Sequence, residues 1–192
     1  MTAQIGDEFM IQDRSYTMVA LSNPIPFHPK EYGITVESRC TACWRGFWCV
    51  YDLSDDELIL RDLYVNAKDM VYPEINGVSI QEKEDYLGHF VYSNLRLPIS
   101  YTGKILVGDG FLWEYYIHMG FQRPWAYKTL LEFIFEEGIL LDTVDRSNMA
   151  RQLRNEIKKD PTTFYEKMTN NLPSYLVESF SADMSIKAWW FK

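Results

Sequence analysis

Hydrophobic and polar positions alternate through much of the first 145 residues, which is typical of strands that bury one face. In the segment 5–21, Phe9 and Ile11 alternate with polar neighbours up to a polar turn at 12–15, and the alternation resumes at Tyr16. Two alternating runs separated by a short polar turn are typical of a β-hairpin. The pattern therefore predicts a hairpin over 5–21.

A second strand, over 44–53, is apolar on both faces, and this pattern favours a central position in a sheet. A polar turn at 54–57 separates it from its expected partner strand, 58–65. One face of the strand carries Trp44, Gly46, Trp48 and Val50, and the other carries Phe47, Cys49, Tyr51 and Leu53.

Further strands are expected at 88–94 and 101–107, the second followed by a tight glycine turn. The segment 111–119 fits a strand or a helix, and its aromatic content favours a strand. Residues 127–144 read as another hairpin, in which Gly138 supplies the positive φ of the turn.

The pattern changes after Asp145. Ser147 is the expected N-cap of a helix whose apolar residues Met149, Leu153 and Ile157 recur every four positions. Two more helices are expected at about 161–168 and 174–180, and the apolar tail 186–191 fits a last strand or a docking segment.

These elements predict an α+β fold: an antiparallel β meander, forming a curved sheet or half-barrel, followed by two or three C-terminal helices. We expect a single domain over 1–192, with 1–145 mainly β and 146–192 a mainly helical appendage that packs on the sheet.

The composition is globular, with 47% hydrophobic and 24% charged residues, and the formal net charge is −8. This charge argues against nucleic acid and anionic membranes as partners and favours a basic protein, although it also serves solubility. Neither a signal peptide nor a membrane span is recognisable, and the three cysteines fall within 40–49. We therefore expect a cytoplasmic protein.

Motifs for chemistry are weak. Cys40-x-x-Cys43 lacks the further ligands of a zinc site, and it precedes a strand, whereas a redox motif of this kind usually opens a helix. His28, His89 and His118 have no metal-site or catalytic spacing, although a nucleophilic pair such as Cys43 with His118 stays open. The sequence therefore predicts no catalytic residue, no metal site and no cofactor.

The segment 54–85 concentrates acidic residues. Nine acids face three bases there, so the segment carries −6 of the net charge, with tyrosines interleaved. This pattern fits a surface for a basic cleft, or else a solvated hairpin edge that discourages strand pairing. The predicted partner-binding residues are Asp55, Asp56, Glu57, Asp62, Tyr64, Asp69, Tyr72, Glu74, Glu82, Glu84 and Asp85.

In its length, its charge and its acidic stretch, the chain resembles the small acidic immunity proteins with which bacteria neutralise toxins. The resemblance covers the whole chain as a profile and includes no specific motif. It implies a non-enzymatic, cytoplasmic inhibitor that covers the active site of a basic toxin of the nuclease type.

Two alternatives remain at this stage. One is a small-molecule-binding protein or small enzyme with a pocket in the curved sheet, lined by Trp44, Trp48, Tyr115, Tyr116 and His118. The other is an assembly role in which Trp189, Trp190 and Phe191 form an oligomer contact.

Overall fold

The structure, a computed structural model, describes residues 2–81 and 88–160. This part contains nine strands, one α-helix and three short 3₁₀ helices. The strands are β1 (Glu8–Ile11), β2 (Arg14–Leu21), β3 (Phe47–Ser54), β4 (Glu57–Val65), β5 (Phe90–Tyr92), β6 (Leu97–Pro98), β7 (Gly103–Phe111), β8 (Tyr127–Glu136) and β9 (Ile139–Asp145). The helices are α1 (Ser147–Lys159), η1 (Pro29–Tyr32), η2 (Trp113–Tyr115) and η3 (Pro124–Ala126).

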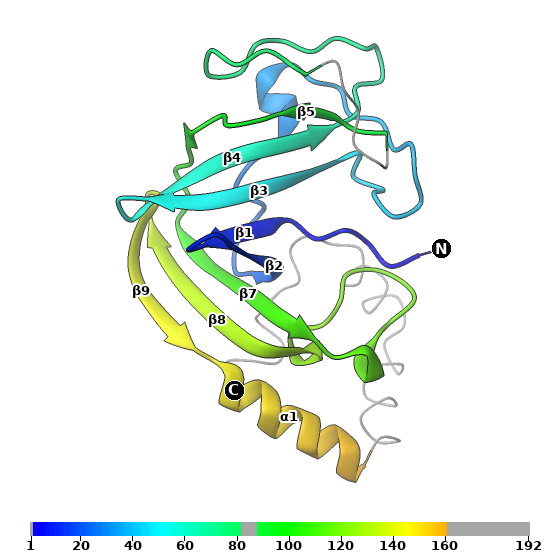
Figure 1. The fold of residues 1–192 in the computed structure, drawn as a ribbon, viewed down its shortest axis with the longest axis vertical. Coiled ribbons are helices and arrows are strands. Elements are labelled where there is room, and N and C mark those ends of the chain that lie inside the picture. The colour runs from blue at the N-terminus through cyan, green and yellow to red at the C-terminus, as the bar shows by residue number, and fades with distance from the viewer. Residues whose placement is uncertain (1, 82–87, 161–192) are drawn as a thin grey trace.

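The strands form one sheet that closes on itself. Its order is β3-β1-β2-β7-β8-β9-β4-β5, and β4 also pairs with β3, so seven strands complete a ring (Figure 1). The join between β4 and β9 is narrow, because only Glu57 and Ile139 are paired there. Elsewhere the pairing is longer, as in the hairpin of β3 and β4.

The predicted antiparallel meander is wrong in its strand order. β1 pairs in parallel with β3, through Glu8 with Val50 and Phe9 with Tyr51, so the sheet is mixed. The hairpin of β1 and β2 lies between β3 and β7, so that β3, the next strand along the chain, is beside β1 and not beside β2 as in a meander. The long connection 22–46 permits this insertion, whereas residue alternation identifies strands and not their neighbours.

The expected α+β class is also wrong. The described residues form a mainly β structure with a single α-helix, α1, rather than a sheet followed by two or three helices. The segments expected as further helices, 161–168 and 174–180, and the apolar tail 186–191 lie outside the described residues. No helix in the described part is long and apolar enough to cross a membrane.

Large apolar side chains fill the interior of the ring. The rings of Phe9 and Phe133 stack with centroids 5.0 Å apart, which joins β1 to β8 across the core. β3 confirms the expected burial of both faces and the central position, although it begins at Phe47 rather than at 44. Its inward residues are Phe47, Cys49 and Tyr51, and its buried outward residues are Trp48 and Val50.

α1 covers part of the outer face of the sheet. Ala150 and Ile157 are its buried residues, and Arg154 donates to the backbone oxygens of Trp125 and Tyr127. Ser147 was expected as the N-cap, but it is the first helical residue, and Arg146 occupies the N-cap position. Its Oγ accepts a hydrogen bond from the backbone N–H of Leu130 at 3.0 Å, so this hydroxyl fastens the helix to β8.

The segment 111–119 is not the expected strand. β7 continues through Gly108 and Gly110 to Phe111, where the tight turn had been expected, and the chain then enters η2. Phe111 is the last residue of β7 that pairs with β8, so the following aromatic residues have no ladder to join. The outcome shows that aromatic content alone does not define a strand.

Candidate functional site

Strand β4 divides the predicted acidic surface. Asp55, Asp56 and Glu57 lie at the tip of the β3–β4 hairpin, whereas Asp69 and Glu74 follow the opposite end of β4. β4 is nine residues long, which corresponds to about 27 Å at the usual rise of a strand. The two groups therefore do not form one surface patch.

The middle of the predicted surface is occupied by internal contacts. Asp62 accepts a hydrogen bond from the backbone N–H of Asn94 at 2.8 Å. The ring of Tyr64 stacks on Trp48 with centroids 3.7 Å apart, and Tyr72 accepts a hydrogen bond from a backbone N–H. These three side chains therefore stabilise the fold through contacts within the protein. Glu82, Glu84 and Asp85 lie outside the described residues.

Two hairpin tips meet at one end of the ring. The N–H of Leu58 donates to the oxygen of Gly138, and the N–H of Leu140 donates to the oxygen of Asp56, both at 2.8 Å. These bonds bring the β3–β4 turn beside the β8–β9 turn. We call the resulting group of five exposed carboxylates the acidic end: Asp55, Asp56, Glu57, Glu136 and Glu137.

Local sequence explains the shape of both tips. Asp55 and Asp56 have φ values of 52° and 63°, as a two-residue hairpin turn requires, and aspartate tolerates this region. In the β8–β9 turn, the two central residues Glu137 and Gly138 have φ values of 49° and 90°. The sequence identified both turns, but it gave no signal that they touch, and so Glu136 and Glu137 were missed.

No positive side chain neutralises the acidic end in the described part of the chain. The segments that build it, 52–60, 97–102 and 133–145, contain no lysine or arginine, and its carboxylates take part in no ion pair there. Two apolar side chains lie exposed next to it, Ile139 at 46% and Leu141 at 59%. Chemically, this end accepts hydrogen bonds and attracts cations.

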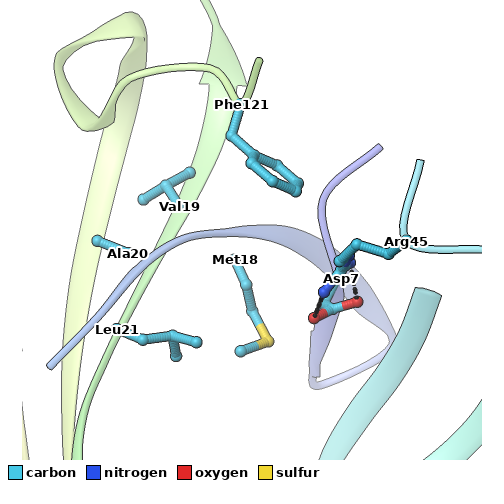
Figure 2. A pocket seen from close by; sticks show the side chains of 7 residues that line it. All are labelled: Asp7, Met18, Val19, Ala20, Leu21, Arg45 and Phe121. Atoms are coloured by element: carbon cyan, nitrogen blue, oxygen red, sulfur yellow. Dashed lines mark hydrogen bonds and ion pairs between the residues drawn. The ribbon is translucent and has the colours of Figure 1, made fainter. Parts of the chain in front are cut away.

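A second polar group is buried where β1 begins. Asp7 binds Arg45 through two hydrogen bonds, of 2.7 and 3.1 Å (Figure 2). It also accepts one from the backbone N–H of Cys49 at 2.9 Å. Although burial disfavours the charged guanidinium, the carboxylate of Asp7 raises the pKa of Arg45. The guanidinium of Arg45 therefore keeps its positive charge.

A small cavity adjoins this ion pair, between Asp7, Arg45, Phe121 and β2, as Figure 2 shows. Its volume is about 20 Å³, which accommodates about one water molecule. The cavity is not lined by any of the five residues expected to form a pocket, which are Trp44, Trp48, Tyr115, Tyr116 and His118. Trp48 is packed on Tyr64, and Trp44 is 45% exposed.

The candidate nucleophiles are held in their neutral form. Burial raises the pKa of the Cys43 thiol to about 11 and that of Cys49 well above its usual value. No hydrogen bond joins Cys43 to His118 within the described ranges; His118 is exposed and lies against the ring of Tyr116. His28 accepts from the N–H of Lys30 through Nδ1, at 3.1 Å.

Across the described residues, no group of three histidine, cysteine or acidic side chains is arranged to hold a metal ion. No family model matches the sequence, and neither a curated protein nor a solved structure matches it significantly.

Proposed function

We propose that the protein binds a basic protein partner through the acidic end and inhibits it by covering its active site, as the resemblance to immunity proteins implies. The observation that supports this proposal is the meeting of five exposed carboxylates on two hairpin tips without a neutralising cation in the described residues. The protein itself performs no chemistry and acts in the cytoplasm.

Charge and shape both support this use of the acidic end. Unpaired carboxylates speed the encounter with a basic cleft, and salt weakens this effect. Ile139 and Leu141 provide apolar area beside the charges, as interface cores require. The tips are held by backbone hydrogen bonds, so little order is lost on binding.

No observation in the described residues favours a small-molecule pocket instead. The cavity beside Asp7 and Arg45 has room for about one water molecule, whereas ligand pockets typically measure about 300–1,000 Å³.

The test begins with co-purification of the tagged protein from its native host and identification of any stoichiometric basic partner. Association with that partner, and inhibition of its activity, are then measured for a variant with all five carboxylates neutralised: Asp55→Asn, Asp56→Asn, Glu57→Gln, Glu136→Gln and Glu137→Gln. The matched control removes the same charge from exposed positions elsewhere: Asp13→Asn, Glu31→Gln, Asp69→Asn, Glu74→Gln and Glu156→Gln.

We expect the first variant to associate at least about tenfold more slowly at low salt, and to lose inhibition, while the control stays within about twofold. An equal loss in both variants would show that net charge matters and the acidic end does not. Purification of the protein without a stoichiometric partner from its host would contradict the inhibitor function itself.

A further inference from the structure

Cys40 and Cys43 are the first and last residues of a tight turn. The N–H of Cys43 donates to the oxygen of Cys40 at 3.2 Å, which closes the turn. Such a turn brings the two Cα atoms within about 7 Å, and disulfides bridge Cα atoms at roughly 4.4–6.8 Å. Neither Thr41 nor Ala42 has a positive φ, so the turn is unstrained. Its backbone is therefore suited to a disulfide.

The two thiols differ in access. Cys40 is half-buried and packs on the cluster that contains Cys43, Trp48 and Val50. Cys43 is 3% exposed, and its thiol donates to the backbone oxygen of Phe47 at 3.3 Å. An accessible thiol beside a sheltered one is the arrangement in which the first reacts with an external oxidant and the second displaces it.

Charge and position single out this pair among the three cysteines. Burial raises the pKa of the Cys43 thiol, and the guanidinium of Arg45 offsets only part of this effect, so Cys43 is the less reactive thiol and suits the second step, in which the attack is within the molecule. Cys49 instead points into the core of the ring, whereas Cys40 and Cys43 belong to a cluster on the outer face of β3. Cys49 is fully buried and therefore inaccessible to the oxidant.

We propose that Cys40 and Cys43 form a redox-reactive pair that a small-molecule disulfide, such as oxidised glutathione, closes into a disulfide bond. The Cys40 thiolate attacks one sulfur of the oxidant, which releases one thiol and leaves a mixed disulfide. The Cys43 thiolate then attacks the sulfur of Cys40 and releases the second thiol. The protein loses two electrons and two protons, and the oxidant gains them as two thiols.

The turn is also an anchor for the N-terminal segment. The N–H of Ile5 donates to the oxygen of Ala42 at 2.8 Å, and the side chain of Gln4 donates to the oxygen of Thr41 at 2.9 Å. This segment leads directly to Asp7 and β1. A disulfide between Cys40 and Cys43 therefore restricts the backbone of the turn to which the segment before β1 is hydrogen-bonded.

The test is a thiol count on the full chain, equilibrated in glutathione buffers with a rising fraction of the oxidised form. After an acid quench, the free thiols are alkylated in denaturant and counted by intact mass. Trypsin cleaves after Arg39 and Arg45, so both cysteines fall in one peptide, 40–45. We expect the alkylated thiols to decrease from three to one and this peptide to lose two hydrogens.

Substitutions assign the pair. Cys49→Ser should still lose two thiols, and Cys40→Ser should keep both of its thiols free. Cys43→Ala should lose one thiol, because glutathione stays attached to Cys40 when no second cysteine displaces it; Cys43→Ser replaces the alanine variant if that does not fold. The proposal is overturned if all three thiols stay free in oxidised glutathione alone. It is equally overturned if, in the parent protein, glutathione remains attached to Cys40, because Cys43 then fails to displace it.

Discussion

The carboxylate of Asp7 is held by three hydrogen bonds at the start of β1. It is 6% exposed and accepts these bonds from Arg45 and from the N–H of Cys49. Loss of its charge leaves the guanidinium buried without a counter-ion. We expect Asp7→Asn to lower the free energy of unfolding by about 3–5 kcal/mol, measured by urea denaturation.

Asp109→Asn is the control for this prediction, because it breaks the ion pair of Asp109 with the exposed side chain of Arg14. Exposed pairs contribute about 0–1 kcal/mol, so this variant should unfold almost as the parent does. Similar losses in the two variants would show that burial of the Asp7–Arg45 pair is not what makes it important.

Tyr127 should make the fold sensitive to alkali. Burial raises the pKa of its hydroxyl to about 12, although a hydrogen bond with Thr17 opposes the shift. Because the pKa is higher in the folded state, the contribution to stability is complete below pH 10 and decreases as the pH rises towards 12. Tyr127→Phe should therefore reduce the slope of stability against pH by roughly 1 kcal/mol per pH unit in this interval.

Urea denaturation between pH 9 and 12 measures this slope, with Tyr116→Phe, at an exposed ring, as the control. Part of the slope should remain in Tyr127→Phe, because burial also raises the pKa of Tyr92 to about 12. An unchanged slope in Tyr127→Phe would mean that another group dominates the alkaline transition.

Among the elements, the β8–β9 turn depends on a glycine for two reasons. Gly138 has a φ of 90°, and a Cβ built there would lie 2.4 Å from the backbone oxygen of Ile99. A methyl group therefore adds both an unfavourable backbone conformation and a steric overlap with a neighbouring segment. We expect Gly138→Ala to lower the free energy of unfolding by about 2–5 kcal/mol.

Gly77 separates the two causes. Its φ is 76°, but a Cβ there would meet no atom within 4 Å. Gly77→Ala should consequently cost only about 1 kcal/mol, for the backbone conformation alone. Equal unfolding midpoints of the two variants would mean that the oxygen of Ile99 moves aside, and that the join between the tips is looser than described.

The sequence predicts hairpins well and the segments between them poorly. Both hairpins that meet at the acidic end follow from two alternating runs around a short polar turn, since each of these signals is local. Helix α1 follows from its own periodicity in the same way. The expected strand at 111–119 is wrong because membership of a sheet depends on a partner, and after Phe111 the chain has none on β8.

At the scale of the whole molecule, the acidic end concentrates like charges. Mutual repulsion opposes the meeting of the two tips, and salt screens it. The variant neutralised at all five positions should therefore be more stable than the parent at low salt, and the difference should shrink as salt is added. Thermal unfolding at about 10 mM and 0.5 M salt tests this expectation.

The control with five dispersed substitutions should gain less, because its charges are farther apart. A gain that is independent of salt would have another origin, such as the preference of asparagine over aspartate in the turn at 55 and 56. Such a result would leave the repulsion between the tips without support.

The closed arrangement is what the sequence could not supply. The parallel pairing of β1 with β3 and the bridge between Glu57 and Ile139 join residues far apart along the chain, and no local pattern encodes such contacts. The acidic end depends on the same bridge. The sequence alone therefore identifies three of its five carboxylates, Asp55, Asp56 and Glu57, whereas Glu136 and Glu137 require the folded molecule.

The insertion of the β1–β2 hairpin between β3 and β7 has a consequence during synthesis on the ribosome. The hairpin is made early, but β7 begins only at Gly103, and the last strand of the ring, β9, ends at Asp145. β3 can cover the edge of β1 as soon as residue 54 has emerged, but the nascent hairpin exposes the outer edge of β2 until β7 has emerged. Unpaired edges are sites of mispairing between chains, so the growing polypeptide is more prone to aggregate than the finished molecule.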